Sequence, residues 1–227
     1  TGRWSHTGVQ TGNMPRGRKL FSDAVEKGEL TERELYSAIR TADPDWLEFT
    51  FGPDLGRPMW LLSDAIRGFL VADKGKELVV ADYSSIEGRV AAWVAGETWK
   101  LDAYVANDEG RGAGLYELAA GGIYSIPVES VTKFQRQVGK VSELSLQFQS
   151  GVNGLAAMAA NYGLRLHEVF ASVWEAASLE RRERAVERYE ECVARNDSAT
   201  SELGREGWLA AELIKVGWRE TNPAIKA

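Results

Sequence analysis

The chain has 227 residues, of which 44% are hydrophobic and 26% charged, and its net charge of −6 argues against a general basic nucleic-acid coat protein. Its apolar runs are shorter than the ~20 residues that a membrane span requires, so we expect no membrane partner. A single cysteine and two distant histidines exclude an internal disulfide and a zinc-like cluster, which favours a cytoplasmic setting. The first residues show neither an initiator Met nor a signal-peptide pattern, so we expect a piece of a longer protein.

The first part of the chain alternates irregular segments with short helices. Residues 1–19, rich in Gly, Arg and polar residues, predict a loop or irregular strand. Residues 31–40 predict a helix, with Thr31 and Glu34 spaced as a capping box. The Pro and Gly content of residues 43–56 indicates a connection between helices.

A second helix and one strand come next. Residues 59–70 have helical apolar periodicity, and residues 77–83, ELVVADY, form a nearly continuous β-prone apolar run. Such a run is typical of a strand that is covered on both faces. Most of the remaining sequence has a helical pattern, including residues 179–194, whose interleaved charges indicate a solvated helix face.

The junction after the predicted strand carries a candidate metal ligand. The strand ends at Asp82, and Ser84 with Glu87 has capping-box spacing for a helix that Gly96 would end. A fixed carboxylate beside the Tyr83 carbonyl is a suitable oxygen site for Mg²⁺. The alternative is that Asp82 is a turn acid and Glu87 only a helix cap. The apolar face of this helix comprises Ile86, Val90, Trp93 and Val94.

A second candidate site lies on the helix that begins after Thr132, which with Gln135 forms another capping box. Two cations near a helix N-terminus are mildly disfavoured by the helix dipole, and a bound polyphosphate would offset that. The apolar residues further along would offer a platform for a nucleotide base. The alternative is an ordinary amphipathic helix with solvated cations and core apolar residues. The four residues of this stripe, at intervals of four, are Arg136, Lys140, Leu144 and Phe148.

These stretches, in this order, resemble family A DNA polymerases, the DNA polymerase I type, and particularly their phage-encoded branch. The family signature Asp-Tyr-Ser-x-Ile-Glu-x-Arg is matched from Asp82 to Arg89, and Arg136 with Lys140 matches the cation pair of the fingers helix. "TGRWSHTGVQTGNMPRG" at the N-terminus and "GWRETNPAI" near the C-terminus resemble two further family segments.

The resemblance implies a role for each matched residue in template-directed DNA synthesis by a two-metal mechanism. Asp82 and the Tyr83 carbonyl would bind Mg²⁺, of which two ions are expected in the intact parent enzyme. Glu87 would act as the steric gate against ribose, and Arg136 and Lys140 would bind the triphosphate and assist catalysis. The remaining implied contacts are Tyr116, Leu144 and Phe148 with the incoming dNTP, and Arg3 and Asn13 with primer-template DNA.

The resemblance also implies the fold. We expect a helix-dominated α+β chain, with a partial palm over residues 1–95 that contains an incomplete antiparallel sheet, and helical fingers over residues 96–227. The family's later His-Asp-Glu motif, which carries the second metal ligand, is not found in this sequence. We therefore expect weak or no polymerisation by the chain itself, and self-association through the strand edge at residues 77–83. The expected location is the cytoplasm of a bacterial or phage-infected cell.

Two alternative functions remain. The chain could be the non-catalytic dNTP- or DNA-binding half of a split polymerase, whose partner supplies the second carboxylate. A different nucleotide enzyme is disfavoured, because "GRGAG" at residues 110–114 follows no convincing strand and no Gly-x4-Gly-Lys-Ser/Thr loop occurs.

Overall fold

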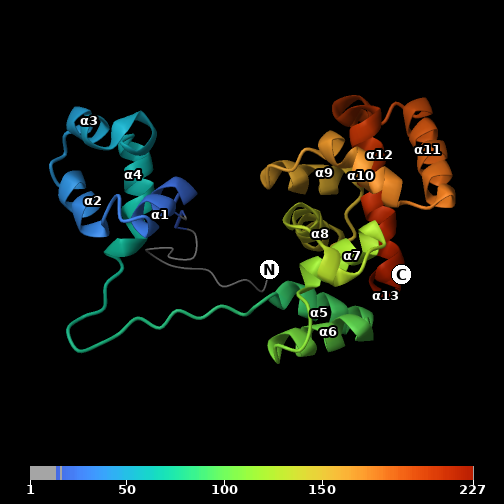
Figure 1. Ribbon diagram of the computed structural model, residues 1–227, viewed down its shortest axis with the longest axis horizontal. Helices are drawn as coiled ribbons and strands as arrows, with labels where there is room; N and C mark the ends of the chain where they lie inside the picture. Colours follow the sequence, from blue (N-terminus) through green and yellow to red (C-terminus); the bar gives the residue numbers. More distant parts are fainter. Residues whose placement is uncertain (1–13, 16, 227) are drawn as a thin grey trace. The chain divides into compact units, whose positions relative to one another are not determined.

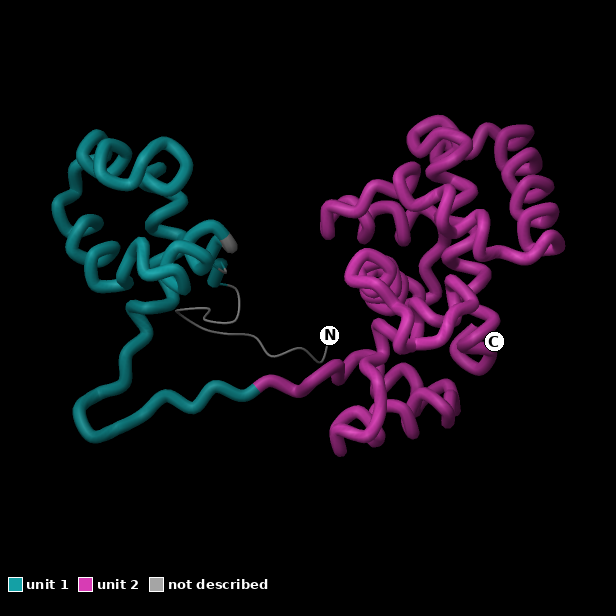
Figure 2. The backbone as a smooth tube through the Cα atoms, viewed as in Figure 1, with its two compact units in different colours: residues 1–81 teal, residues 82–227 magenta. Residues whose placement is uncertain are grey.

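The computed structural model describes residues 14, 15 and 17–226, and all regular elements in this described part are helices. The chain divides into two compact units, residues 1–81 and 82–227 (Figure 2). The assignment of residues 1–95 to a palm and 96–227 to fingers stays a prediction.

The first unit has its own small apolar core. Leu35, Leu47 and Leu61 are buried in it and come from three different helices. The capping box of Thr31 and Glu34 is confirmed, since the Glu34 amide donates to the Thr31 hydroxyl and the Thr31 amide donates to the Glu34 carboxylate. The helices of this unit are α1 (Lys19–Glu26), α2 (Glu32–Ile39), α3 (Pro44–Leu55), α4 (Pro58–Ala65) and the 3₁₀ helix η2 (Ile66–Phe69) (Figure 1).

The prediction of a connection over residues 43–56 was wrong, because α3 occupies that stretch. The Asp43 carboxylate accepts a hydrogen bond from the Trp46 amide, and Pro44 occupies the first turn, where its missing N–H costs nothing. Gly52 has a φ of 76° and kinks the helix just before Pro53. The Pro and Gly residues therefore mark a helix start and a kink.

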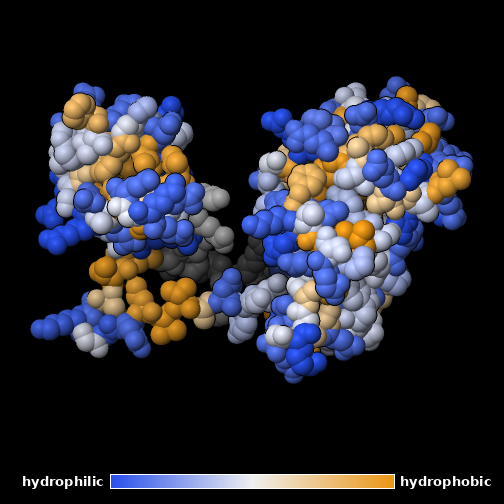
Figure 3. Space-filling model, in the orientation of Figure 1, coloured by the Kyte–Doolittle hydropathy of each residue, from blue (hydrophilic) through white to orange (hydrophobic). Residues whose placement is uncertain are grey.

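The predicted α+β fold class, with its strand and incomplete antiparallel sheet, is contradicted for the described residues, whose regular elements are all helices. Residues 77–83 are extended but unpaired, and Val79 and Val80 are exposed. Apolar side chains are visible along this extended segment in Figure 3. A β-prone run becomes a strand only when a neighbour accepts and donates its backbone hydrogen bonds, and no described segment does so.

The second unit is built around α12, the longest helix. It packs against α7, α8, α9, α10 and α11, and Leu209, Ile214 and Trp218 on it are buried in the core (Figure 1). None of the helices in the described residues is long and apolar enough to span a membrane. The helices are α5 (Ile86–Ala95), α6 (Thr98–Asp108), α7 (Leu115–Tyr124), η3 (Val128–Ser130), α8 (Lys133–Leu146), α9 (Val152–Asn161), α10 (Leu166–Ala176), α11 (Leu179–Ala194), α12 (Ser198–Thr221) and α13 (Pro223–Lys226).

Helices α7 and α8 approach each other closely because α8 carries Gly139 at their contact. A Cβ atom at Gly139 would lie 2.1 Å from the Tyr116 carbonyl oxygen and 2.9 Å from the Ala120 amide nitrogen. The predicted capping box of Thr132 and Gln135 is confirmed and fixes the start of α8. The sequence of α8 thus determines both where the helix begins and how near it lies to α7.

Candidate functional site

The segment that leads into α5 presents the candidate metal ligand. Ser85, not Ser84, is the N-cap residue of α5, and its φ of 52° turns the chain sharply before the helix. The predicted capping box of Ser84 and Glu87 was therefore wrong, although Glu87 does lie in the first turn. Gly96 ends the helix with a φ of 74°, as predicted.

A pocket of about 310 Å³ lies between this segment and helices α5, α6, α7 and α8. Five of the predicted site residues line it: Asp82, Tyr83, Glu87, Tyr116 and Leu144. The other seven lining residues were not predicted as site residues; they are Ser85, Ile86, Gly88, Tyr104, Leu115, Glu143 and Gln147. Residues predicted from three separate stretches are therefore brought together at one site.

The two predicted phosphate-binding cations lie outside the lining of this pocket. Arg136 pairs through Nε with the Glu117 carboxylate, and its guanidinium carbon lies 5.3 Å from the centroid of the Tyr116 ring. Lys140 places Nζ 4.7 Å from the centroid of the Tyr162 ring. Since Tyr116 itself lines the pocket, Arg136 contacts a residue of the pocket wall. Burial raises the pKa of Tyr116, which keeps its hydroxyl protonated.

The last residue of the predicted stripe is not on the helix. Helix α8 ends at Leu146 with Gln147 as C-cap, so Phe148 follows the helix and is exposed. Its proposed contact with a base stays a prediction. Arg3 and Asn13, the predicted DNA contacts, lie outside the described residues.

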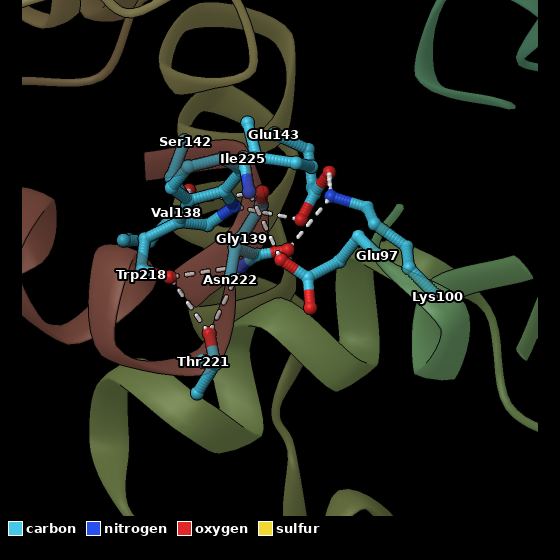
Figure 4. Close-up of polar contacts among 10 residues, drawn as sticks. All are labelled: Glu97, Lys100, Val138, Gly139, Ser142, Glu143, Trp218, Thr221, Asn222 and Ile225. Atoms are coloured by element: carbon cyan, nitrogen blue, oxygen red, sulfur yellow. Dashed lines mark hydrogen bonds and ion pairs between the residues drawn. The ribbon is translucent and has the colours of Figure 1, made fainter. Parts of the chain in front are cut away.

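A buried polar network supports the α8 side of the pocket (Figure 4). Lys100 on α6 donates from Nζ to the Glu143 carboxylate at 2.6 Å and to the Asn222 side-chain oxygen at 3.1 Å. Trp218 on α12 donates from Nε1 to the other Glu143 oxygen at 2.7 Å. Both carboxylate oxygens of Glu143 are therefore occupied by protein donors, and the network fixes α8 against α6 and α12.

A second set of hydrogen bonds, close to this network, joins Glu97 to α13. The Glu97 carboxylate accepts hydrogen bonds from the Ala224 and Ile225 amides, at 2.8 and 3.1 Å, at the start of α13 (Figure 4). A carboxylate at a helix N-terminus satisfies amides that have no partner within the helix. The "GWRETNPAI" stretch thus has a structural role, because it supplies Trp218 and Asn222 to the network.

An ion pair joins α5 and α6, which also border the pocket. Arg89 on α5 donates to both carboxylate oxygens of Asp108 on α6, at 2.8 and 2.7 Å, and these hydrogen bonds lower the pKa of Asp108. The Arg89 guanidinium also lies 4.5 Å from the centroid of the Tyr104 ring. Burial, with a smaller contribution from the Glu143 charge, raises the pKa of Tyr104 to about 12.

The described residues fit only part of a magnesium site. Asp82, Tyr83 and Glu87 line the pocket, whereas both carboxylate oxygens of Glu143 are already bonded. No cluster of three or more His, Cys, Asp or Glu side chains suitable for a metal occurs in the part of the chain that the structure describes. Mg²⁺ prefers near-octahedral oxygen ligation, so other ligands must complete the shell.

Comparison with known proteins identifies relatives of the chain. It is 34% identical over 183 residues to a DNA polymerase of Bacillus phage SP02, a match that covers 78% of this chain. It is also 29% identical over 102 residues to DNA polymerase I of Aquifex aeolicus, covering 44% of this chain, and 32% identical over 91 residues to DNA polymerase I of Pseudomonas aeruginosa, covering 40%. The chain is related to family A DNA polymerases. This confirms the resemblance drawn from the sequence motifs.

The match covers only part of each polymerase. It corresponds to 25% of the phage polymerase, 17% of the Aquifex aeolicus polymerase and 9% of the Pseudomonas aeruginosa polymerase. No family model matches the chain, and neither does any solved structure.

Proposed function

We propose that the chain forms the dNTP-binding part of a DNA polymerase that carries out template-directed synthesis. The observation that carries this proposal is the shared pocket. Asp82, Glu87, Tyr116 and Leu144, which the family motifs select from three stretches of sequence, line the same pocket of about 310 Å³. The relation to DNA polymerases supports the same activity.

Different pocket residues would contact different parts of the nucleotide. Asp82 and the Tyr83 carbonyl would contribute oxygen ligands to Mg²⁺, which when bound polarises the phosphate and activates the primer 3′-hydroxyl. Glu87 would exclude a ribose 2′-hydroxyl, and Leu144 would contact the sugar and base. A two-metal mechanism requires a further carboxylate, which the parent polymerase would supply.

Arg136 and Lys140 would bind the triphosphate from the side of α8. Arg136 can hold phosphate oxygens through paired hydrogen bonds, and Lys140 acts as a point charge that can also stabilise departing pyrophosphate. The Glu117 carboxylate now occupies Arg136, so a bound triphosphate would replace one anionic partner with another. Phe148 would stack on a base, and Arg3 and Asn13 would contact primer-template DNA.

Nucleotide titration of the chain tests this function. We expect dATP with Mg²⁺ to bind, and Arg136→Ala or Lys140→Ala each to weaken binding by about 1.5 to 3 kcal/mol, as for a hydrogen bond to a charged group. Arg184→Ala is the matched control, because Arg184 is an exposed cation on α11 that pairs with Glu180. An absence of dATP binding, or unchanged affinity in both Arg136→Ala and Lys140→Ala, would refute the proposed function.

Exposed apolar surface favours a second candidate, the non-catalytic half of a split polymerase. Val79 and Val80 in the extended segment, and Trp93 and Val94 on α5, are exposed. A partner chain that covers the exposed residues of α5 could also bring the further carboxylate. Restoration of primer extension by a separate chain bearing His-Asp-Glu would support this candidate, whereas concentration-dependent dimers of the chain alone would support self-association.

A further inference from the structure

Two largely buried side chains line the pocket with polar groups that make no hydrogen bond to the described residues. The Gln147 side chain at the end of α8 and the Tyr104 side chain on α6 are only 8% and 5% exposed, respectively. Within the described part of the chain, neither the Gln147 amide nor the Tyr104 hydroxyl makes a hydrogen bond. The polar atoms of Gln147 and Tyr104 are not among the fully buried side-chain atoms without a partner in the described residues, so they can be reached from the pocket.

A glycine on α5 provides the space in which these two groups lie. A Cβ atom at Gly88 would stand 2.2 Å from the Tyr104 hydroxyl oxygen and 3.1 Å from Gln147 Oε1. Both polar atoms therefore border the same position on α5, on the wall of the pocket. Any other residue at position 88 would displace at least the Tyr104 hydroxyl.

We infer that Gln147 and Tyr104 form a recognition pair that donates and accepts hydrogen bonds to the nucleoside of the bound dNTP. This inference rests on the proposed dNTP-binding function of the pocket. An amide both donates and accepts, and so does a protonated phenol. Burial keeps Tyr104 protonated, so the pair is neutral and suits the sugar or base better than the phosphates. The cations that would bind phosphate lie outside this pocket.

The stability of the free chain separates this role from a structural one. If the Gln147 amide has no partner until a nucleotide binds, its replacement by the apolar Met should leave the melting temperature unchanged or raise it. A residue that only supports the fold would lower the melting temperature when replaced. Loss of binding together with unchanged or increased stability is therefore the expected signature.

The experiment titrates the whole chain with dATP and, separately, with inorganic tripolyphosphate, both with Mg²⁺. We expect Gln147→Met and Tyr104→Phe each to weaken dATP binding about threefold to tenfold, the range for one hydrogen bond. Tripolyphosphate affinity should stay unchanged in both variants. The matched controls are Gln137→Met, on α8 but outside the pocket lining, and Tyr124→Phe, a buried tyrosine on α7, and neither should alter dATP affinity.

The outcomes separate this inference from the proposed function. If the wild-type chain binds neither probe, both fail. If the wild type binds dATP and responds to Arg136→Ala, but Gln147→Met and Tyr104→Phe leave dATP affinity unchanged, only the recognition pair is refuted. Equal weakening of dATP and tripolyphosphate also refutes it. Titration with 2′,3′-dideoxyATP identifies the contacted group, because a contact with the 3′-hydroxyl would make this ligand insensitive to both variants.

Discussion

Lys100 places its ammonium nitrogen 2.6 Å from the Glu143 carboxylate, and the Lys100 side chain is 0% exposed. A buried pair of this kind is costly to desolvate, and removing one partner leaves the other charge uncompensated. The Trp218 indole and the Asn222 side chain offset part of that cost by bonding to the pair. Since Glu143 also lines the pocket, the pair links the core of the second unit to the candidate site.

Lys100→Met should therefore destabilise the second unit strongly. We expect a loss of about 3 to 5 kcal/mol in the free energy of unfolding, measured by urea denaturation. The control is Arg184→Met, which removes an exposed pair on α11 and should cost less than about 1 kcal/mol. An equal loss in the free energy of unfolding for both variants would show that the buried Lys100 pair contributes no more to stability than an exposed pair.

Gly139→Ala should separate α7 from α8. The added methyl group would lie 2.1 Å from the Tyr116 carbonyl oxygen, and a backbone atom can move away only if the whole helix shifts. We expect a loss of about 1 to 3 kcal/mol in the free energy of unfolding, as for other overpacked positions. Gly151→Ala is the control, since a Cβ at Gly151 meets nothing within 4 Å. Comparable melting temperatures for the two variants would contradict the close packing.

The raised pKa of Tyr104 predicts a loss of stability at alkaline pH. The folded chain holds the Tyr104 proton up to a pKa of about 12, whereas the ordinary pKa of a tyrosine, expected in the unfolded chain, is 10.0. Below pH 10, Tyr104 is protonated in both the folded and the unfolded chain, and its titration does not lower the free energy of unfolding. Between pH 10 and 12 the unfolded chain loses this proton more readily than the folded chain, so the free energy of unfolding falls. A shift of this size corresponds to about 3 kcal/mol at most. The free energy of unfolding of Tyr104→Phe should fall less than that of the wild type over this range.

Glu87→Ala should relax the choice of sugar. If Glu87 excludes the 2′-hydroxyl, the ratio of the rATP to dATP dissociation constants should fall by about tenfold, or about 1.4 kcal/mol. The measurement is competitive titration of the chain with both nucleotides. An unaltered ratio would leave Glu87 as a first-turn helix residue without a role in discrimination.

Features that depend on neighbouring residues could be predicted from the sequence. The capping boxes at Thr31 and Thr132 form as expected, because each requires only a side chain and a backbone amide three residues apart. The box predicted at Ser84 failed because the turn at Ser85 moved the helix start by one residue. The prediction of a connection over residues 43–56 was wrong because Pro favours a first helical turn as well as a loop.

Features that depend on distant partners could not be predicted. Residues 77–83 have strand composition, but composition does not supply a neighbouring strand. The motifs selected Asp82, Glu87, Tyr116 and Leu144 for one pocket, whereas Tyr104 and Gln147 belong to no motif and join the site only through packing. Lys100 has no sequence signal at all, because its burial depends on partners on two other helices.

The hydrogen bonds of Lys100 to Asn222, and of Glu97 to Ala224 and Ile225, close loops of 122 to 128 residues. Contacts this distant along the chain form late, because the intervening segment must be ordered first. A ribosome that has made the chain only as far as Lys215 has therefore not yet supplied the groups that hold the α8 wall in place. The α8 wall of the pocket can be held in place only after residues 216–225 have emerged.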